Sequence, residues 1–297
     1  MRIAIIAAGV VGTATGIGLE KKGNDVVFYD IDSIRLAQLA HEGHQTASDV
    51  GDAVKRSDVS MICAPTPTRN ATVDLRPLLS ICVEVGRALR GRRSYHLAVV
   101  RSTVPPGTTR GLVIPRIKES AELPSDSDKV GVCHNPEFLR EKFALDDFLE
   151  PRGIVIGEMD AKAGAMLQSV YSSLKSPIIR CSPETSEMIK YTANLFNATK
   201  ISFFNEIDHA CKILGAEPET VSRAMPLLAL GLRDDLKEWG LSGGRPFGGM
   251  CLPKDLEAFI SVMLSRGTDV PLLSAVKKVN QIMVQKEVEA PELMVHD

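Results

Sequence analysis

The stretch Arg2-Ile3-Ala4-Ile5-Ile6-Ala7-Ala8-Gly9-Val10-Val11-Gly12 decides the fold. Its first part, Ile3 to Ala7, is a short apolar run of the β type, and a helical pattern from Thr13 to Lys22 follows the glycines. The next apolar run, Val26 to Asp30, predicts a second strand that ends in an acidic residue. Strand, glycine turn, helix and strand form a βαβ unit, and an acid about 20 residues after the turn is what dinucleotide binding requires.

This unit predicts NAD as the cofactor. The helix N-terminus would hold the pyrophosphate at the turn residues, which are Gly9, Val10, Val11 and Gly12. Asp30 would accept hydrogen bonds from the adenosine ribose, and it favours NAD over NADP because a carboxylate repels a 2′-phosphate. Arg35 is a further cofactor-binding candidate close to Asp30. Ala7 stands where the fingerprint usually has its first glycine. Two outcomes are open: the tight turn tolerates the methyl group, or the methyl group weakens cofactor binding.

Two further strands of the α/β pattern end in turns that could bind ligands. The strand Val59 to Ala64 ends in Pro65-Thr66-Pro67, and the strand His96 to Val100 leads to Arg101-Ser102-Thr103-Val104-Pro105. Ligands bind outside the carboxyl ends of the strands in open α/β sheets, which is where these turns would lie.

The strand Val130 to Cys133 opens into Asn135-Pro136-Glu137-Phe138-Leu139-Arg140-Glu141. Asn135 can cap a short helix that Pro136 starts, and Glu137 and Glu141, four residues apart, would share one face of it. Two acids at this spacing are usually a solvated edge.

The pattern changes from α/β alternation to helices after a strand near Pro177 to Cys181. Ser182-Pro183-Glu184 is a good helix start, and no breaker follows before about Leu214, which predicts a helix of roughly 45 Å. Lys190 and Asn194 lie four residues apart on it and point the same way. We therefore expect an α/β protein: a Rossmann-type doubly wound parallel sheet in residues 1–181, followed by an all-helical domain in residues 182–297 with a long spine helix.

The last motif is Gly248-Gly249-Met250-Cys251-Leu252-Pro253-Lys254-Asp255. Pro253 suits the first position of a helix, so unpaired N–H groups and the positive end of the helix dipole would lie near the Cys251 sulfur. Such a site favours thiolate over thiol, and the two glycines would let a substrate approach the backbone. A buried cysteine at a loop-to-helix junction is the ordinary interpretation of one such residue.

Together these motifs resemble the UDP-glucose/GDP-mannose dehydrogenase family, with Asn-Pro-Glu-Phe-Leu-x-Glu, Lys-x-x-x-Asn and Gly-Gly-x-Cys-x-Pro-Lys-Asp in the family's order. The resemblance implies an NAD-dependent oxidoreductase that converts a primary alcohol to a carboxylic acid in two hydride transfers. Cys251 would carry a thiohemiacetal and then a thioester. The substrate would be a nucleotide sugar or a smaller alcohol.

The resemblance also implies roles for single residues. Thr66, Glu141 and Lys254 would hold the cofactor, and Thr103 would order a water or contact the nicotinamide end. Lys190 and Asn194 would stabilise the oxyanion, Asp255 would accept a proton or hold the attacking water, and Glu137 would be the base in thioester hydrolysis. The remaining substrate-binding candidates are Phe138, Leu139 and Gly248.

Three features depart from the family's pattern. Lys142 stands where the family often has glycine, and Val279 to Met283 lacks the arginine that members tend to carry there. Family members also continue into a third, Rossmann-like domain that binds the nucleotide, so this chain is expected to be a truncated form or a natural short form. Two alternatives stay open: a two-electron 3-hydroxyacid-type dehydrogenase that uses Lys190 while Cys251 is idle, and a non-catalytic binding or dimerisation fragment.

The composition is that of a soluble globular protein: 297 residues, 44% hydrophobic, 24% charged, with a net charge of -2. We expect no nucleic-acid partner, because there is no polybasic footprint, and no membrane span. The six scattered cysteines predict reduced thiols in a cytoplasmic protein rather than disulfides or a metal site. The apolar residues of the long helix predict a homodimer through the helical domain.

Overall fold

The computed structural model describes residues 1–69, 72–228, 246–248, 253, 256, 260 and 263–289. The chain divides into two compact units, Met1–Asn194 and Leu195–Asp297, which are described separately. The predicted boundary after residue 181 stays a prediction. The division at Asn194 assigns the first turns of the long helix to the same unit as the sheet.

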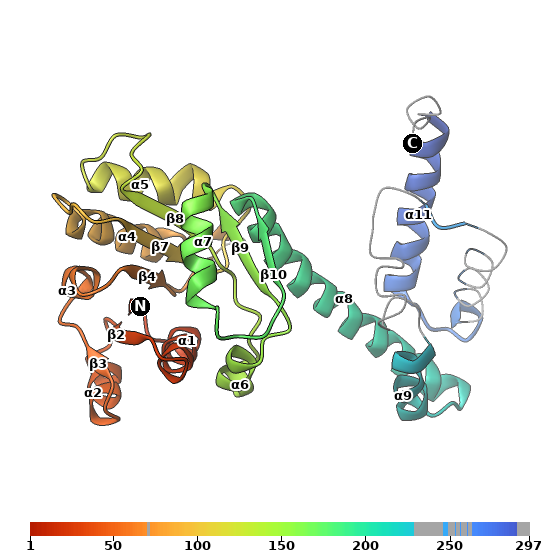
Figure 1. Ribbon diagram of the computed structural model, residues 1–297. Coiled ribbons are helices and arrows are strands. Elements are labelled where there is room, and N and C mark those ends of the chain that lie inside the picture. The colour runs from red at the N-terminus through yellow and green to blue at the C-terminus, as the bar shows by residue number, and fades with distance from the viewer. Residues whose placement is uncertain are drawn as a thin grey trace. The chain divides into compact units, whose positions relative to one another are not determined.

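The first unit is built on an eight-stranded sheet with the order β10-β9-β8-β7-β4-β1-β2-β3 (Figure 1). The strands are β1 (Arg2–Ile6), β2 (Asp25–Tyr29), β3 (Gln45–Thr46), β4 (Val59–Ile62), β7 (His96–Val100), β8 (Val130–His134), β9 (Ile154–Glu158) and β10 (Ile178–Cys181). A separate two-stranded hairpin, β5 (Thr68–Arg69) and β6 (Thr72–Val73), lies after β4 in the chain.

Helices cover both faces of this sheet (Figure 1). They are α1 (Val10–Lys21), α2 (Ser33–His41), α3 (Val50–Lys55), α4 (Arg76–Ala88), α5 (Ile114–Ser120), α6 (Ala144–Leu149) and α7 (Ala161–Val170). A π-helical turn, η1 (Thr109–Val113), precedes α5, and a 3-10 turn, η2 (Glu141–Phe143), precedes α6. The predicted doubly wound α/β fold is confirmed.

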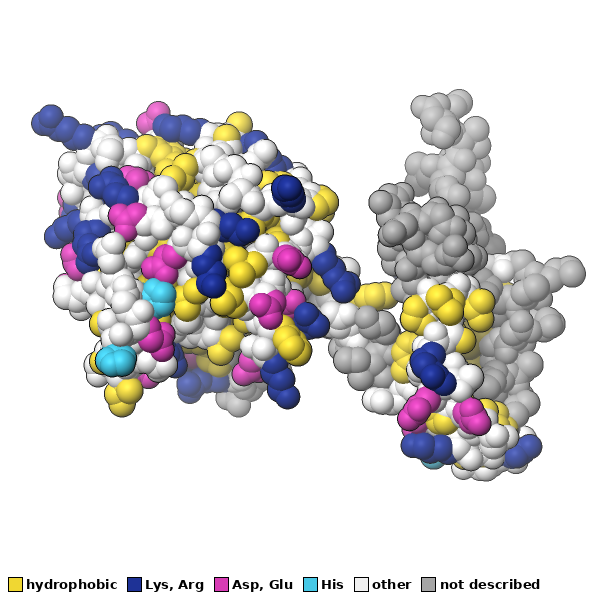
Figure 2. Space-filling model, turned by 60° about the horizontal axis from the view of Figure 1, so that its bottom comes forward, with side chains coloured by type: hydrophobic (Ala, Val, Ile, Leu, Met, Phe, Trp, Pro, Cys, Tyr) yellow, Lys and Arg dark blue, Asp and Glu magenta, His cyan; other side chains and the backbone are white. Residues whose placement is uncertain are grey.

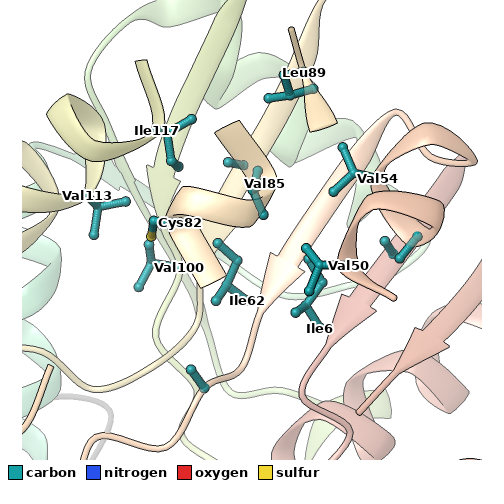
Figure 3. Close-up of a cluster of buried hydrophobic side chains, with 14 of the residues drawn as sticks. Ile6, Val50, Val54, Ile62, Cys82, Val85, Leu89, Val100, Val113 and Ile117 are labelled. Atoms are coloured by element: carbon teal, nitrogen blue, oxygen red, sulfur yellow. The ribbon is translucent and has the colours of Figure 1, made fainter. Parts of the chain in front are cut away.

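The alternation of side chains along the central strands explains the two cores. In β1, Ala4 and Ile6 belong to the core under α3, α4 and α5, whereas Ile3 and Ile5 belong to the core under α1 and α7. Figure 3 shows the first of these cores, in which Ile6 and Ile62 from the sheet lie among residues of the covering helices. Because both faces are covered, each central strand is an almost unbroken apolar run.

The sheet differs from the predicted parallel arrangement at one edge. Strand β9 pairs with β8 in an antiparallel sense, and β10 is parallel to β9. The connection from β8 to β9 contains only the short elements η2 and α6. A parallel neighbour would need a full crossover to the other end of the sheet, whereas this connection returns at the end where β8 finishes.

The long helix is confirmed as α8 (Pro183–Leu214), a single helix of 32 residues. In the second unit it is followed by α9 (Pro218–Leu228) and α11 (Pro271–Glu289). In this unit Ile260 and Met263 are buried together with Ala210 of α8.

Candidate functional site

The glycine turn after β1 is built as a dinucleotide site requires, although it begins with alanine. Ala7 has a φ of 72°, the left-handed conformation that the usual glycine supplies without strain. A Cβ atom on Gly12 would lie 2.2 Å from the carbonyl oxygen of Ala7, so glycine is needed there for α1 to pack against the turn.

The N-terminus of α1 has the features that an anionic cofactor needs. Gly9 is its N-cap and makes no side-chain capping bond, and a Cβ atom built on Gly9 would meet nothing within 4 Å. The first N–H groups of a helix favour an anion at such an open end. The buried carboxylate of Asp30, directly after β2, accepts a hydrogen bond of 2.9 Å from the Asp32 amide and lies 3.2 Å from the Arg35 guanidinium. A dinucleotide fits these residues.

A cavity of about 450 Å³ adjoins this turn. Four of the residues predicted to bind the cofactor line it, although they come from separate segments: Gly9, Val10, Arg35 and Glu141. Polar groups on apolar walls characterise cavities that bind small molecules.

Two more predicted residues meet at the carboxyl ends of β4 and β7. The hydroxyl of Thr66 donates a hydrogen bond of 2.7 Å to the backbone carbonyl of Thr103. Next to it, the buried hydroxyl of Ser102 donates to the carbonyl of Ala64 over 2.7 Å. These bonds tie the two strand-end turns together, so both threonines are held at the edge of the sheet where ligands bind.

Glu137 and Lys190 form a largely buried ion pair at this edge. The Lys190 Nζ atom lies 2.9 Å from Glu137 Oε1 and 2.6 Å from the Glu137 carbonyl oxygen. The side chains are only 15% and 7% exposed, so solvent screens the attraction little. The ring of Phe138 lies under the ammonium group, 5.3 Å from Nζ, a cation–π arrangement.

The predicted short helix from Asn135 is wrong. Residues 135–140 form no helix, and Glu141 opens the 3-10 turn η2, so Glu137 and Glu141 do not share a helical face. Local side-chain bonds take the amides that a helix would use: Glu137 Oε2 accepts from the Leu139 amide at 2.7 Å, and Asp147 accepts from the Arg140 amide at 2.8 Å.

Three hydrogen bonds fix the start of α8 to the same edge of the sheet. The helix also packs closely on β9. Both carboxylate oxygens of Glu187 accept backbone hydrogen bonds, from Gly107 at 2.5 Å and Thr109 at 2.7 Å. Ser186 Oγ lies 2.8 Å from His134 Nδ1. A Cβ atom on Gly157 of β9 would meet the side chain of Ser186 at 2.5 Å, so the missing side chain lets α8 approach. Lys190, one turn further on, is thereby held against Glu137.

Sequence reasoning missed a second polar cluster, at the start of the segment that bears Glu137. It consists of Arg101, Asn135 and Tyr171, all buried, which follow β7, β8 and α7. The signal available in the sequence was the position of Arg101 and Asn135 directly after apolar strands. Nothing in the sequence indicated that their side chains turn inward.

Burial shifts the pKa values of two groups at this edge, His134 and Cys63. Burial lowers the pKa of His134 to about 4, and the charges of Arg101 and Lys190 act in the same direction, so this imidazole is neutral at pH 7. Burial likewise raises the pKa of the Cys63 thiol, directly after β4, to about 11. Cys63 is therefore a thiol at neutral pH and a poor nucleophile.

The remaining predicted residues are only partly described. Asn194, one turn after Lys190 on α8, is exposed, as is Gly248 of the second unit. Cys251, Lys254 and Asp255 lie outside the described residues. The structure therefore brings together Glu137 with Lys190, Thr66 with Thr103, Asp30 with Arg35, and the glycine turn with Glu141.

Comparison with known proteins decides the family. Residues 40–175 match the UDP-glucose/GDP-mannose dehydrogenase family, NAD binding domain, and residues 184–282 match the central domain of the same family. The chain belongs to the UDP-glucose/GDP-mannose dehydrogenase family. It is an NAD-dependent dehydrogenase, as predicted, and the predicted cofactor is confirmed at the level of the family.

Individual family members agree with this assignment. The chain is 37% identical to a GDP-mannose 6-dehydrogenase of Pseudomonas syringae pv. tomato over 306 residues, which cover 96% of this chain and 69% of that protein. It is 32% identical to a UDP-glucose 6-dehydrogenase of Bacillus subtilis, covering 94% of this chain and 63% of that protein. The crystal structure of a ternary complex of GDP-mannose dehydrogenase from Pseudomonas aeruginosa has a TM-score of 0.90 at 33% identity, covering 99% of this chain and 72% of that one.

Two further features concern the charges on the surface and the character of the helices. On the face drawn in Figure 2, basic and acidic side chains are interspersed over the sheet unit. Among the helices in the described residues, none has the length and apolar character to cross a membrane.

Proposed function

We propose that this family member oxidises the primary alcohol of a nucleotide sugar to a carboxylate, using two equivalents of NAD. The observation that carries the proposal is the buried Lys190–Glu137 pair at the ligand-binding edge of a sheet that also bears a dinucleotide turn. Relatives named GDP-mannose 6-dehydrogenase and UDP-glucose 6-dehydrogenase support the substrate class.

Residues of the first unit would supply most of the NAD site, and NAD when bound accepts the hydride of each oxidation. The open N-terminus of α1 at Gly9 would bind the pyrophosphate, and Asp30 with Arg35 would bind the adenosine ribose. Glu141 would contribute from the wall of the adjoining cavity. We assign Thr66, Thr103 and Lys254 to the same cofactor, Thr103 at its nicotinamide end.

Cys251 would carry the substrate between the two oxidations. The alcohol first loses a hydride and a proton to become an aldehyde, and the Cys251 thiolate then adds to its carbonyl carbon to form a thiohemiacetal. Loss of a second hydride and the hydroxyl proton leaves a thioester. Water attacks the thioester, the C–S bond breaks, and the carboxylate and the thiolate are released.

The polar residues of α8 and the Glu137 segment would serve the charged steps. Lys190 and Asn194 would stabilise the oxyanion of each tetrahedral species, a role in which losing one donor typically costs about 3 kcal/mol of barrier. Glu137, as a carboxylate beside Lys190, would take a proton from the attacking water. Asp255 would hold that water or accept a proton. Phe138, Leu139 and Gly248 would contact the sugar.

Turnover of GDP-mannose and UDP-glucose by the purified chain tests this proposal. Uronate formation with NAD is expected from at least one of them, and Cys251→Ser is expected to abolish it while leaving NAD binding intact. Unaltered uronate formation by Cys251→Ser would exclude the thioester route. Cys181→Ser is the matched control, since this partly exposed thiol of the first unit has no role in the proposal.

A further inference from the structure

Arg101 is a buried cation, and within the described part of the chain no carboxylate pairs with it. The residue is 4% exposed, and its hydrogen-bond acceptors within the described residues are all uncharged. Its Nη1 atom donates to the side-chain oxygen of Asn135, to the Tyr171 hydroxyl at 3.0 Å, and more distantly to the Asn135 carbonyl. Its Nε atom has no partner among the described residues.

Keeping such a group inside a protein is unfavourable. A buried charge normally finds an opposite charge, and an unpaired one weakens the fold. Departures from this rule that nothing compensates locally are typical of functional sites. The position of Arg101 fits this interpretation, because it directly follows β7 at the edge where Glu137 and Lys190 lie.

The partners of Arg101 converge on Asn135. The Asn135 side-chain oxygen accepts from both Arg101 and the Tyr171 hydroxyl, the latter at 2.5 Å, and its Nδ2 atom donates to the Val155 carbonyl at 2.7 Å. Both ends of the amide are thus bonded in a residue that is 1% exposed. An amide whose oxygen and nitrogen are both bonded to buried groups has one orientation.

Asn135 in turn fixes the start of the segment that bears Glu137. Only Pro136 separates the two residues, and its ring fixes φ and restricts the residue before it. No helical hydrogen bond stabilises residues 135–140, so their path depends on such side-chain anchors. A shift at Asn135 would therefore be passed on to the Glu137 carboxylate.

We propose that Arg101 is a positioning residue for the site: together with Tyr171 it fixes Asn135, and through Asn135 it holds Glu137 against Lys190. The structural part of this inference concerns the Glu137–Lys190 contact alone. The kinetic part rests on the proposed function, in which Glu137 assists thioester hydrolysis.

Three variants separate the contributions of the Arg101 charge, its hydrogen-bond donors and the Tyr171 hydroxyl. Arg101→Met removes the charge and the donors at similar volume, Arg101→Lys keeps the charge and one donor, and Tyr171→Phe removes only the hydroxyl. Tyr171→Phe is the mildest change and carries the test if Arg101→Met does not fold.

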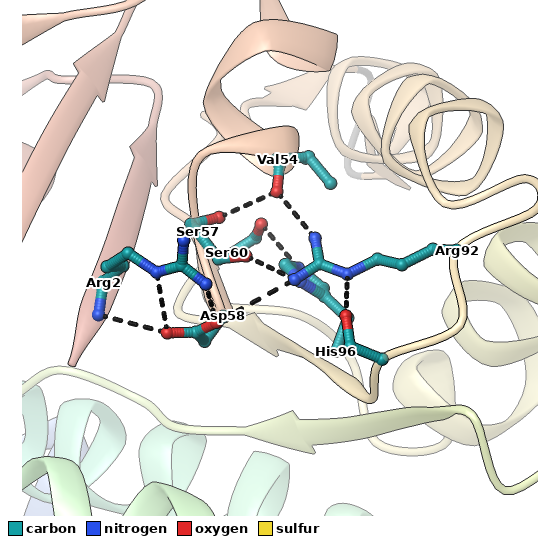
Figure 4. A network of polar contacts seen from close by, with 8 residues as sticks. Arg2, Val54, Ser57, Asp58, Ser60, Arg92 and His96 are labelled. Atoms are coloured by element: carbon teal, nitrogen blue, oxygen red, sulfur yellow. Dashed lines mark hydrogen bonds and ion pairs between the residues drawn. The ribbon is translucent and has the colours of Figure 1, made fainter.

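Arg92 supplies a matched control. Its guanidinium donates to the carbonyl oxygens of Val54 and Ser57 at 2.9 and 2.7 Å, in the network of Figure 4. Arg92 precedes β7 and Arg101 follows it, so the two guanidinium groups serve opposite ends of a five-residue strand. Arg92→Met thus removes a partly buried guanidinium without touching the candidate site.

The first measurement is the crystal structure of each variant. The proposal expects the Glu137–Lys190 distance to exceed 4 Å in Arg101→Met and to stay near 2.9 Å in Arg92→Met. An unchanged ion pair in both Arg101→Met and Tyr171→Phe would overturn it. This arm does not depend on turnover, so it decides the inference even if the wild-type chain forms no uronate and the proposed function fails.

The second measurement is kinetic. Arg101→Met is expected to lower kcat at least tenfold with KM for NAD unchanged within twofold, since small misplacements of reacting groups slow chemistry strongly. Because thioester hydrolysis is the step that Glu137 assists, mass spectrometry of Arg101→Met should show an acyl adduct on Cys251 that accumulates during turnover. Arg101→Lys should recover part of kcat, and Arg92→Met should keep kcat within twofold. If kcat falls equally in Arg101→Met and Arg92→Met, and no acyl adduct accumulates on Cys251, then Arg101 contributes to stability alone.

Discussion

The ammonium group of Lys190 lies 2.9 Å from Oε1 of Glu137 and donates a second hydrogen bond, of 2.6 Å, to the Glu137 carbonyl oxygen. The residues are 53 positions apart in the chain, one on α8 and one in the segment after β8. Their contact joins the helix to the ligand-binding edge of the sheet. It also places a cation and a carboxylate side by side where the proposed chemistry needs an oxyanion donor and a base.

Lys190→Met tests this pair. Removing one partner of a buried ion pair leaves the Glu137 carboxylate uncompensated, so we expect the free energy of unfolding to fall by about 3 kcal/mol. We expect kcat to fall on the order of a hundredfold or more through the lost oxyanion donor. Urea denaturation and steady-state kinetics measure the two effects.

Lys212→Met is the control on the same helix. Its ion pair with Asp208 is exposed, at 66% and 44%, so its loss should change the free energy of unfolding by less than about 0.5 kcal/mol. Equal activity of Lys190→Met and Lys212→Met would contradict the assignment of Lys190.

Ala7→Gly should stabilise the chain. The left-handed conformation at φ 72° costs an alanine about 1 to 2 kcal/mol, and a glycine adopts it without strain. Part of this gain is lost, because glycine has more conformational freedom than alanine in the unfolded chain. We expect a gain of up to about 1 kcal/mol. Ala8→Gly, at a fully buried position without a positive φ, should lower the free energy of unfolding. Losses in both variants, measured by urea denaturation, would mean that Ala7 is not strained.

Gly9→Ala and Gly12→Ala should separate cofactor binding from folding. A methyl group on Gly12 meets the Ala7 carbonyl oxygen at 2.2 Å, so this variant should lower Tm by several degrees. A methyl group on Gly9 meets nothing within 4 Å, so Tm should hardly change. It would occupy the open space at the helix N-terminus, however, and should weaken NAD binding in a fluorescence titration. Unchanged NAD affinity in Gly9→Ala would place the pyrophosphate elsewhere.

The stability of the fold should fall in mild acid. Burial lowers the pKa of His96 to about 3, below its unfolded value, so the unfolded chain binds more protons as pH drops below about 6.5. The contribution of neutral His96 to the free energy of unfolding is therefore complete above about pH 6.5 and is lost on acidification. At pH 5 the loss for this group is about 2 kcal/mol. Urea denaturation at pH 7.5 and pH 5 should show a smaller loss in His96→Gln than in the wild type. An identical pH dependence would show that His96 does not titrate in this way.

The sequence predicted the parts of the molecule that local pattern controls. Apolar runs and the glycine turn located the strands of the sheet, the open end of α1 and the acid after β2. The start of α8 was visible in Ser182-Pro183-Glu184, because capping chemistry is local.

Features that depend on distant partners could not be predicted in this way. Whether the Glu137 segment is helical is decided by competing bonds to the Leu139 and Arg140 amides, one of them from Asp147. An arginine after a strand is normally solvated, whereas Arg101 is buried and donates to Asn135 and Tyr171, which lie far from it in the chain. The antiparallel direction of β9 likewise follows from the short path of its connection.

The number of NADH molecules formed for each molecule of nucleotide sugar consumed distinguishes the thioester route from a single oxidation. With the nucleotide sugar limiting and NAD in excess, absorbance at the NADH band and chromatography of the sugar give the ratio. We expect two NADH for each uronate, because Cys251 captures the aldehyde formed in the first oxidation and holds it for the second. A ratio of one, with a released aldehyde or ketone as the product, would contradict it.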